Sequence, residues 1–211
     1  MRNLLSLRLD AREMTSAASV APSSGAMTIG DRLAPADGES FRVAMRQLAG
    51  GVCLIAHGVG VERVGQTATS VTSLSVDPPS LIVCVSRGTS SYPGLAPGIA
   101  FGVNVLGAHQ QEFADRFFDG AGISGAERFD YGHWIVSPSG APLLSDSLAA
   151  FDCEVDDIIE RHAHAIIIGR VKGVAIRKQG GALVFWRGVY DSLGWDDDEL
   201  SRAVGVTPRA L

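Results

Sequence analysis

Short apolar runs separated by turn residues set the pattern of the chain from Val52 onward. These runs are rich in β-branched residues, which favour strands. Residues 151–155 read Phe-Asp-Cys-Glu-Val, an alternation that places three apolar side chains on one face of a strand. We therefore expect six strands, over residues 52–56, 80–85, 100–106, 150–159, 165–176 and 182–186.

Helical spacing first appears at residues 41–49, where apolar residues recur at i, i+3, i+4, i+7 and i+8. This spacing predicts a short amphipathic helix. Asp37 or Ser40 could cap its first amides, and the pair Gly50-Gly51 offers a left-handed stop at its end.

Two further short helices are expected, one over residues 109–118 and one directly after Ser90-Ser91. Six strands against three short helices do not form the alternating strand–helix pattern of a parallel sheet. A mainly β fold is the better prediction, in the form of a six-stranded antiparallel split barrel of Greek-key type with a few short flanking helices. The 25 glycines suit the tight corners of such a barrel.

Composition divides the chain into three regions. Residues 1–38 are rich in Ala, Ser, Gly and Pro from residue 15 onward, and we expect a mobile extension because they carry no apolar period. Residues 39–195 are expected to form one domain. Residues 196–211 are expected to be a solvated, acidic C-terminal tail.

The charge and cysteine content exclude several partners. The 18 basic and 23 acidic side chains give a net charge of -5, which argues against nucleic acid. No signal peptide is recognised, and no stretch reaches the roughly 18 uncharged apolar residues of a membrane span. The three cysteines, Cys53, Cys84 and Cys153, lie far apart, so we expect reduced thiols in a cytoplasmic protein.

The common nucleotide and hydrolase fingerprints are missing from the sequence. Gly58, Gly60 and Gly65 resemble a dinucleotide-binding loop, but Arg63 stands where the third glycine is required. A hairpin turn is the better interpretation. The P-loop, the zinc-protease motif and the nucleophile elbow of hydrolases do not occur either.

A hydroxyl-rich segment over residues 65–73 is a candidate for binding a flavin ring. Ala68 leaves space for close approach, while Thr67, Thr69 and Ser70 can form hydrogen bonds to the polar edge of the heterocycle. The alternative is a solvent-facing strand edge.

A second such segment, residues 86–93, is a candidate for binding a phosphate. Ser90 or Ser91 can cap a helix whose free amides attract an anion. Arg87 adds a planar set of donors, each charge-assisted bond contributing on the order of 1.5 to 3 kcal/mol. The alternative is a plain helix cap beside a solvated arginine.

Two histidines, His162 and His164, stand two residues apart on a predicted strand and would share one face. Because no carboxylate or cysteine accompanies them at ligand spacing, no metal site is predicted. His164 could instead meet a nicotinamide or donate a proton near a reduced flavin. A strand histidine without a role is the alternative.

The stretch Gly65 to Pro79 resembles the signature of the flavin reductase-like, FMN-binding split-barrel family, which includes reductase components of two-component aromatic monooxygenases. The match continues in chain order through Ser86-Arg87 with Ser90-Ser91, residues 101–106, Gln110 with Phe113-Ala114 and Arg116-Phe117, residues 140–144, residues 151–155, His164 followed by residues 168–171, and Arg187-Gly188 with Tyr190. In total the resemblance covers about residues 40 to 193.

The resemblance implies an NAD(P)H-dependent flavin reductase that passes hydride from NADH or NADPH to FMN or FAD and supplies reduced flavin to a partner monooxygenase. It also implies a homodimer. By this resemblance His164 lies near the nicotinamide. The flavin-binding residues implied are Thr67, Ala68, Thr69, Ser70 and Val71 for the ring and ribityl chain, Ser86, Arg87, Ser90 and Ser91 for the phosphate, and Asn104 beside the flavin.

Two positions depart from the family pattern. Thr69 stands where an amide residue is common, and Ala163 stands where an acidic residue often precedes the histidine. Two other functions remain open at this point: a tightly FMN-bound oxidoreductase acting on another acceptor such as a corrinoid, and a flavin-binding module without turnover.

Overall fold

The computed structural model describes residues 33, 35–119, 121–123, 125–177 and 180–194. The chain divides into two compact units, Met1–Phe41 and Arg42–Leu211. The predicted tail over residues 196–211 and nearly all of the predicted extension over residues 1–38 lie outside the described residues. Within the part of the chain that is described, no helix is both long and apolar enough to cross a bilayer.

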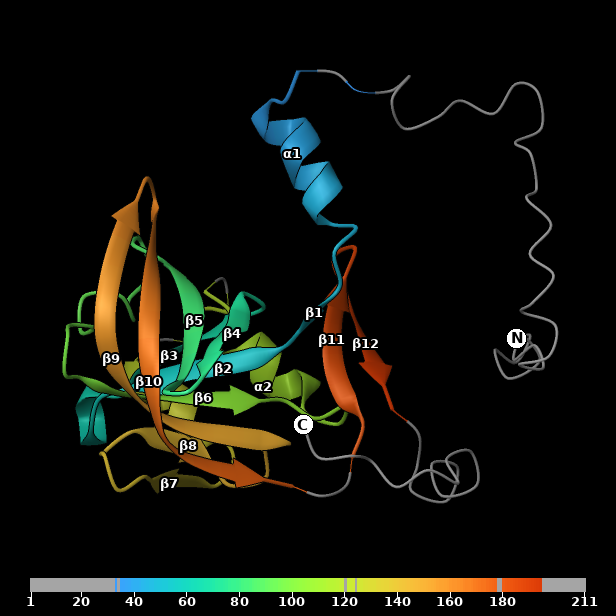
Figure 1. Ribbon diagram of the computed structural model, residues 1–211. Coiled ribbons are helices and arrows are strands. Elements are labelled where there is room, and N and C mark those ends of the chain that lie inside the picture. The colour runs from blue at the N-terminus through green and yellow to red at the C-terminus, as the bar shows by residue number, and fades with distance from the viewer. Residues whose placement is uncertain (1–32, 34, 120, 124, 178–179, 195–211) are drawn as a thin grey trace, which may run out of the picture. The chain divides into compact units, whose positions relative to one another are not determined.

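Antiparallel strands are the main secondary structure (Figure 1). They are β1 Gly50–Gly51, β2 Cys53–His57, β3 Val64–Ala68, β4 Val71–Val76, β5 Pro79–Ser86, β6 Ala100–Val105, β7 Trp134–Val136, β8 Pro142–Leu144, β9 Ala149–Arg161, β10 His164–Ile176, β11 Ala182–Trp186 and β12 Val189–Leu193. The helices are α1 Gly38–Met45 and α2 Gln111–Arg116, with 3-10 helices η4 Gly60–Glu62 and η5 Gly125–Asp130. The mainly β, antiparallel prediction is confirmed, and all six predicted strands are present.

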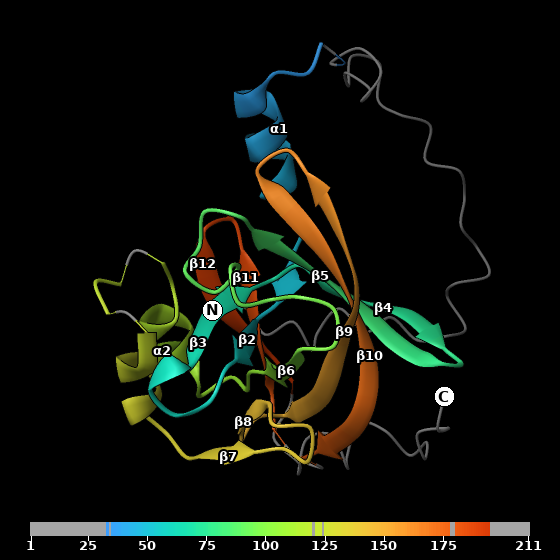
Figure 2. The ribbon, with the colours of Figure 1, turned by 90° about the vertical axis from the view of Figure 1, so that its left-hand side faces the viewer.

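A seven-stranded sheet in the order β3-β2-β6-β9-β10-β5-β4 carries the rest of the fold. In Figure 2 the long strands β9 and β10 lie side by side, as their pairing over residues 149–176 requires. The two edge strands, β3 and β4, are joined only by Thr69-Ser70, so the end of one edge adjoins the start of the other. The prediction missed two strands of this sheet, β3 and β4, because neither has an apolar run.

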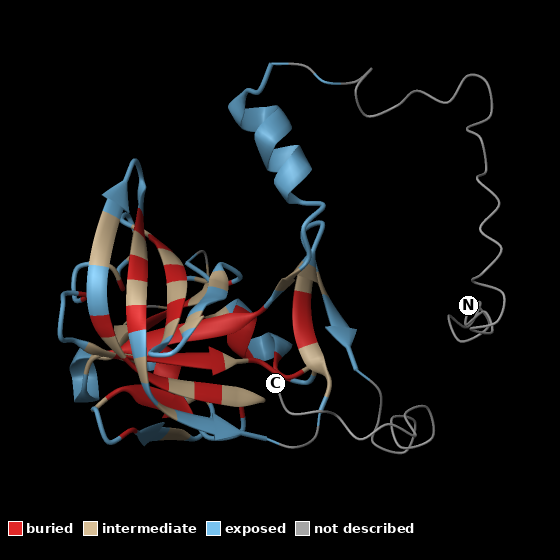
Figure 3. Cartoon of the chain, viewed as in Figure 1, coloured by how far each residue is buried: buried red, intermediate tan, exposed pale blue. Residues whose placement is uncertain are grey.

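Strand β2 is buried along its whole length because each of its faces meets a different core (Figure 3). Cys53 and Ile55 belong to an inner core, and Leu54 and Ala56 belong to an outer core. The inner core also contains Leu81, Val83, Val85, Phe101, Val103, Cys153, Val155 and Ile167. The outer core also contains Val52, Leu106, Phe113, Phe117, Phe129, Leu144 and Leu183. Such two-sided burial explains why β2 reads as a continuous apolar run.

The first helix is capped at Asp37, one of the two predicted caps, but it spans Gly38–Met45 and so begins and ends earlier than the predicted residues 41–49. Asp37 Oδ1 accepts a hydrogen bond from the Ser40 amide at 2.7 Å, and Ser40 Oγ accepts one from the Asp37 amide at 3.0 Å. This reciprocal cap holds the pKa of Asp37 below its usual range, chiefly through the Ser40 amide. The prediction of a left-handed stop at Gly50-Gly51 is wrong, because both glycines pair with β11 as strand β1.

The helix predicted after Ser90-Ser91 is also wrong, since residues 87–94 form consecutive turns. Ser91 is 2% exposed, its hydroxyl donates to Gln66 Oε1 at 2.7 Å, and its carbonyl accepts from His57 Nε2 at 2.6 Å. At Gly94 an added Cβ would lie 2.5 Å from His57 Cε1. These contacts hold the segment against β2 and β3 in place of a helix.

The two histidines of the predicted strand do not share a face. His162 lies in the turn that joins β9 to β10, with a left-handed φ of 52°, and His164 is the first residue of β10. The prediction failed because a tight turn interrupts the two strands between Arg161 and His164, which are paired across it.

Two other local predictions are confirmed. On β9, Cys153 and Val155 lie in the inner core with Phe151 packed against it, as their alternation predicted. The glycine-rich stretch after β2 forms an antiparallel hairpin with β3, and Gly58 and Gly60 have φ values of +84° and +57°. These positive angles are readily available to glycine.

The stability of the protein should depend strongly on Gly102 of β6, where no side chain fits. An added Cβ would lie 2.2 Å from the carbonyl oxygen of Pro142, which is backbone and cannot rotate away. We expect Gly102→Ala to lower the free energy of unfolding by at least about 1–3 kcal/mol, as measured by urea denaturation. Gly51→Ala is the matched control, since nothing lies within 4 Å of its added Cβ. Equal effects of the two substitutions would contradict this packing.

Candidate functional site

A cavity of about 260 Å³ opens where β3 passes into β4, next to the start of β10. We call it the hydroxyl cavity. It is lined by Gln66, Thr67, Ala68, Thr69, Ser70, Cys84, Ser86, Thr89, Phe118, Asp119 and His164. Six of the residues predicted from the sequence are among them: Thr67, Ala68, Thr69, Ser70, Ser86 and His164.

Strand register brings the distant parts of this cavity together. Ser86 at the end of β5 lies directly opposite His164 at the start of β10. Residues that face each other on paired strands project to the same side of the sheet. Since Val83 and Val85 point into the inner core, Cys84 and Ser86 face the opposite way, toward the cavity.

Hydrogen bonds fix some of the hydroxyl groups and leave another free. Thr67 Oγ1 donates to the Ala114 carbonyl at 2.7 Å, and Ser70 Oγ donates to the Cys84 carbonyl at 2.9 Å. The hydroxyl of Thr69 and the imidazole of His164, both exposed, have no hydrogen-bond partner among the residues that the structure describes. These two groups are therefore available to a ligand.

A buried polar chain supports the wall of the cavity at Gln66. The Ser91 hydroxyl holds the Gln66 side chain, and the buried His57 holds the Ser91 carbonyl. Burial lowers the pKa of His57, which favours the neutral imidazole, and the hydrogen bond to the Ser91 carbonyl partly offsets this effect. Ser91 therefore supports the cavity from behind and does not line it, and the exposed Ser90 does not line it either.

Arg87 does not line the cavity but directly follows Ser86, which does, and it is turned toward the β9–β10 hairpin. Its Nη2 is 3.0 Å from Glu160 Oε2, and its Nη1 donates to the His162 carbonyl at 3.3 Å. Tyr92 donates its hydroxyl proton to the other carboxylate oxygen of Glu160, and this hydrogen bond raises the pKa of Tyr92. The guanidinium of Arg87, which the sequence analysis assigned to a phosphate, is thus paired with the carboxylate of Glu160 from the same chain.

Two predicted residues lie away from the cavity. Asn104 is fully buried, with Nδ2 donating to the Leu54 carbonyl at 3.3 Å and Oδ1 accepting from the Leu144 amide at 2.7 Å. Its side chain thus joins β2 to β8 within the core. Val71, on β4, is partly buried against the inner core.

Sequence reasoning did not single out Gln66, Cys84, Thr89, Phe118 or Asp119 as lining residues. Phe118 continued the apolar pattern of the predicted second helix, but α2 ends at Arg116 and leaves Phe118 60% exposed in the cavity. Gln66 and Thr89 lie inside the two hydroxyl-rich segments, so the signal for them was present.

The buried guanidinium of Arg128 positions Phe118 and Asp119. Its Nη1 donates to the carbonyls of Gly65 at 2.8 Å and Phe117 at 3.2 Å, and its Nε donates to the Ile123 carbonyl at 2.8 Å. These bonds hold the segment that follows α2 against β3. The position of Phe118 therefore depends on a side chain that itself does not line the cavity.

The donor set of the hydroxyl cavity fits a flavin. Small side chains at Ala68 and Ser70 leave room for a flat ring, the Phe118 ring offers an aromatic face, and the free hydroxyl of Thr69 can bind a polar ring edge. Over the described residues, no group of three or more His, Cys, Asp or Glu side chains is placed to hold a metal ion.

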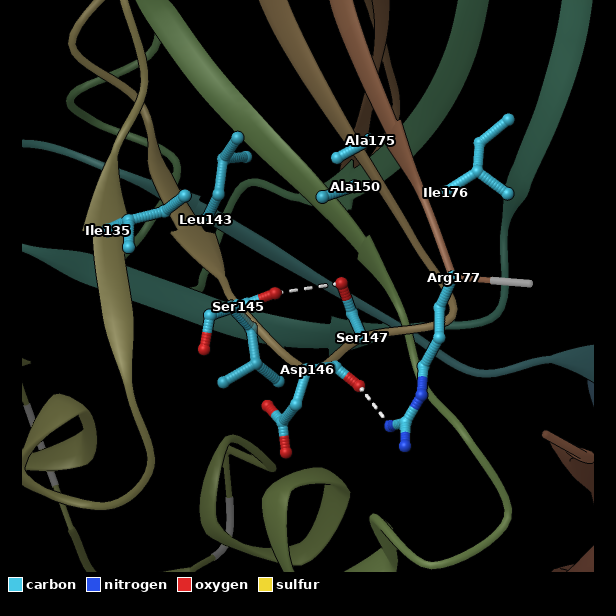
Figure 4. A pocket seen from close by; sticks show the side chains of 10 residues that line it. Ile135, Leu143, Ser145, Asp146, Ser147, Ala150, Ala175, Ile176 and Arg177 are labelled. Atoms are coloured by element: carbon cyan, nitrogen blue, oxygen red, sulfur yellow. Dashed lines mark hydrogen bonds between the residues drawn. The ribbon is translucent and has the colours of Figure 1, made fainter. Parts of the chain in front are cut away.

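A larger cavity of about 400 Å³ lies at the other end of β10, around Ala175 to Arg177 (Figure 4). Two of its polar side chains bind backbone carbonyls: Arg177 Nη1 donates to the Asp146 carbonyl at 3.2 Å, and Ser147 Oγ donates to the Leu144 carbonyl at 2.9 Å. None of the predicted site residues lines it. Size alone therefore does not make it the functional site.

Comparison with known proteins identifies related sequences. The family model described as "Flavin reductase like domain" matches residues 45–194. The FMN reductase (NADH) RutF of Methylorubrum extorquens is 38% identical over 162 residues, which are 75% of this chain and 77% of that protein. The FMN reductase (NADH) RutF of Bradyrhizobium diazoefficiens is 33% identical over 161 residues, covering 75% of this chain and 87% of its own.

Solved structures with the same architecture are also similar. BorF, the flavin reductase component of a bacterial two-component tryptophan halogenase, has a TM-score of 0.68 and 32% identity, covering 74% of this chain and 98% of its own. The NADH:FAD oxidoreductase SgcE6 of Streptomyces globisporus, in complex with NAD and FAD fragments, has a TM-score of 0.66 and 29% identity, covering 78% of this chain and 100% of its own.

The cysteines provide a chemical test of the hydroxyl cavity. Cys84 lines it, whereas burial raises the pKa of Cys53 and of Cys153 to about 12, so that both stay protonated at pH 8. We expect iodoacetamide to label Cys84 first and FMN to slow that labelling several-fold, as followed by peptide mass spectrometry. Labelling of Cys84 at the same rate with and without saturating FMN would place the flavin elsewhere.

Proposed function

The chain belongs to the flavin reductase-like family, and we propose that it reduces FMN with NADH in the hydroxyl cavity. It is an NADH-dependent flavin oxidoreductase, as the FMN reductases and NADH:FAD oxidoreductase among its relatives and structural neighbours indicate. The observation that carries the assignment of the site is that three separate parts of the chain with predicted ligand residues, Thr67 to Ser70, Ser86 and His164, meet around one cavity.

The proposed roles follow from the contacts. Thr67 and Ser70 are fixed by their own hydrogen bonds and shape the wall, while the free Thr69 hydroxyl and the backbone of Ala68 contact the flavin ring. When bound, the flavin supplies the ring nitrogen that accepts hydride from the nicotinamide. The protein contributes orientation, because hydride transfer needs the two rings in contact at roughly 3 to 3.5 Å.

His164 is proposed to face the nicotinamide. It is exposed at the mouth of the cavity, opposite Ser86, and no described side chain fixes its ring. Ala163, which precedes it, cannot supply an orienting carboxylate. The imidazole is therefore free to turn toward a ligand and to hold or donate a proton there.

Arg87 and Glu160 are proposed to set the preference for a phosphorylated flavin. Arg87 follows Ser86 in the chain, so a flavin phosphate at the rim would compete with the Glu160 carboxylate for the same guanidinium. Because the side chains of Arg87 and Glu160 are 43% and 50% exposed, water screens this pair and exchange is feasible.

We also propose that the reduced flavin leaves the protein and serves a separate flavin-dependent monooxygenase in the cytoplasm. The similarity to BorF, a component of a two-component system, supports a separate acceptor. The three free cysteines are compatible with a reducing compartment. Equilibrium dialysis separates this proposal from tight FMN binding, since flavin retained through dialysis would contradict it.

Steady-state oxidation of NADH and NADPH with FMN, FAD and riboflavin tests the function, and two variants test the rim. Arg87→Ala should lower the affinity for FMN about tenfold and leave the affinity for riboflavin nearly unchanged, because riboflavin has no phosphate. Glu160→Gln should have the opposite effect. It should raise the affinity for FMN a few-fold relative to the affinity for riboflavin, because the competing carboxylate is lost.

Each result has a distinct interpretation. Absence of nicotinamide oxidation with all three flavins would refute the reductase function and leave a flavin-binding module. If the wild-type protein oxidises NADH but Arg87→Ala lowers the affinities for FMN and riboflavin equally, only the phosphate site is refuted. His164→Asn should lower kcat/KM for NADH while FMN binding is retained.

A homodimer is the last element of the proposal. None of the eight residues of α1 is buried, and a helix this short is marginal in water without a partner surface. Val43 is 53% exposed on this helix. We expect a dimer in sedimentation equilibrium, which Val43→Glu weakens. Val61→Glu, at an 89% exposed position on η4, is the control, and its sedimentation equilibrium should still give the mass of the dimer. A wild-type monomer at micromolar concentration would refute the dimer.

A further inference from the structure

A second cavity of about 360 Å³ adjoins the hydroxyl cavity and shares two of its residues, Thr69 and Ser70. We call it the arginine cavity. It is lined by Arg42, Met45, Arg46, Leu48, Gly50, Thr69, Ser70, Phe185, Arg187 and Gly188. The function proposed above assigns no ligand to this second cavity, although Thr69 and Ser70 line both spaces.

Three guanidinium groups and no carboxylate line the described part of this cavity: Arg42, Arg46 and Arg187. In the described residues none of the three is within ion-pair distance of an acidic side chain. This contrasts with Arg87, which follows Ser86 of the hydroxyl cavity and is already neutralised by Glu160. Three unneutralised guanidinium groups favour an anion, and their planar donors suit phosphate oxygens.

Arg187 has a left-handed backbone conformation that few residue types adopt easily. Arg187 and Gly188 form the two-residue turn between β11 and β12, with φ values of 53° and 89°. Turns of this type prefer Asn-Gly, because a left-handed φ brings Cβ close to a backbone carbonyl oxygen, which glycine avoids and asparagine tolerates. A strained conformation of this kind is a reason to ask what the side chain does.

Gln47 orients the Arg187 side chain without neutralising it. Gln47 Oε1 accepts from Arg187 Nε at 2.9 Å and from Nη2 at 2.6 Å, and the Arg187 guanidinium stacks on Trp186, 4.3 Å from the ring centroid. Both partners are uncharged, and Nη1 has no hydrogen-bond partner among the described residues. The cation is therefore held in place with its charge available.

The remainder of the lining is apolar. Met45 and Leu48 are 47% and 68% exposed, and Phe185 is half-buried against Tyr190, with ring centroids 5.2 Å apart. Exposed apolar groups beside cations fit a ligand that joins a flat heterocycle to phosphates. A purine nucleotide has this chemistry.

We propose that the arginine cavity binds the ADP-ribosyl half of the nicotinamide dinucleotide, with its pyrophosphate on Arg42, Arg46 and Arg187. The proposal rests on the proposed function, in which Thr67 to Ser70 hold the flavin ring. The nicotinamide that faces His164 and contacts that ring shares the hydroxyl cavity with Thr69 and Ser70. These two residues also line the arginine cavity, so the ribose and pyrophosphate enter that adjoining space. The adenylate of FAD, by contrast, extends from the phosphate end at Ser86 and Arg87.

Calorimetric titration of the full chain with ADP-ribose, which lacks the nicotinamide, tests the site directly. Arg187→Asn removes the cation and supplies a residue that the turn prefers, so the variant should fold and keep or raise its Tm. We expect it to bind ADP-ribose about tenfold more weakly, the loss of one charge-assisted contact, with FMN binding unchanged. Arg170→Gln is the matched control, because Arg170 pairs with Asp156 on β9 away from both cavities.

Kinetics distinguish the two possible sources of an adenylate. With FMN saturating, Arg187→Asn should raise KM for NADH about tenfold. It should leave KM unchanged for 1-benzyl-1,4-dihydronicotinamide, a hydride donor without phosphates. With NADH fixed, the ratio of FAD to FMN affinity should not change. A change confined to FAD would overturn the assignment to the nicotinamide dinucleotide.

The remaining outcomes also decide the matter. If the wild-type chain does not bind ADP-ribose, or Arg187→Asn and Arg170→Gln lower its affinity equally, the arginine cavity is not its site. These results leave flavin reduction intact, since that function fails only if neither NADH nor the benzyl donor is oxidised with any flavin.

Discussion

Arg128 is only 4% exposed, and its positively charged guanidinium group holds together segments that are far apart in the sequence. Taking a cation out of water costs several kcal/mol, so its burial requires acceptors that are already in place. Carbonyl oxygens from β3, from the end of α2 and from Ile123 supply them. At Gly65, where an added Cβ would lie 2.9 Å from Phe117 Cε1, the missing side chain permits this close approach. The wall of the hydroxyl cavity is a product of this arrangement.

Much of the fold and part of the site could be predicted from the sequence. The six predicted strands are those with apolar runs or clear alternation, because burial against one or two cores leaves that pattern in the sequence. The hydroxyl-rich segments were recognised by composition. Their meeting with His164 depends on the pairing of β5 with β10, which places Ser86 opposite that residue, and no local pattern encodes such a register.

The failed predictions have a common physical reason, which is that distant partners decide the local conformation. Ser91 is a good helix cap in isolation, but its hydroxyl and carbonyl are bound by β3 and β2. Gly50-Gly51 could end a helix, yet β11 supplies strand partners. The place of Asn104 beside the flavin stays a prediction, and Leu54 and Leu144 hold both ends of its side-chain amide in the core.

The burial of β2 on both faces has a further consequence for how the molecule loses its structure. The inner and outer cores share this strand, Cys53 and Ile55 contributing to one and Leu54 and Ala56 to the other. Neither core can melt while the other keeps its full set of contacts. Unfolding is therefore coupled across the sheet, and the amides of β2 should be among the last to exchange with solvent.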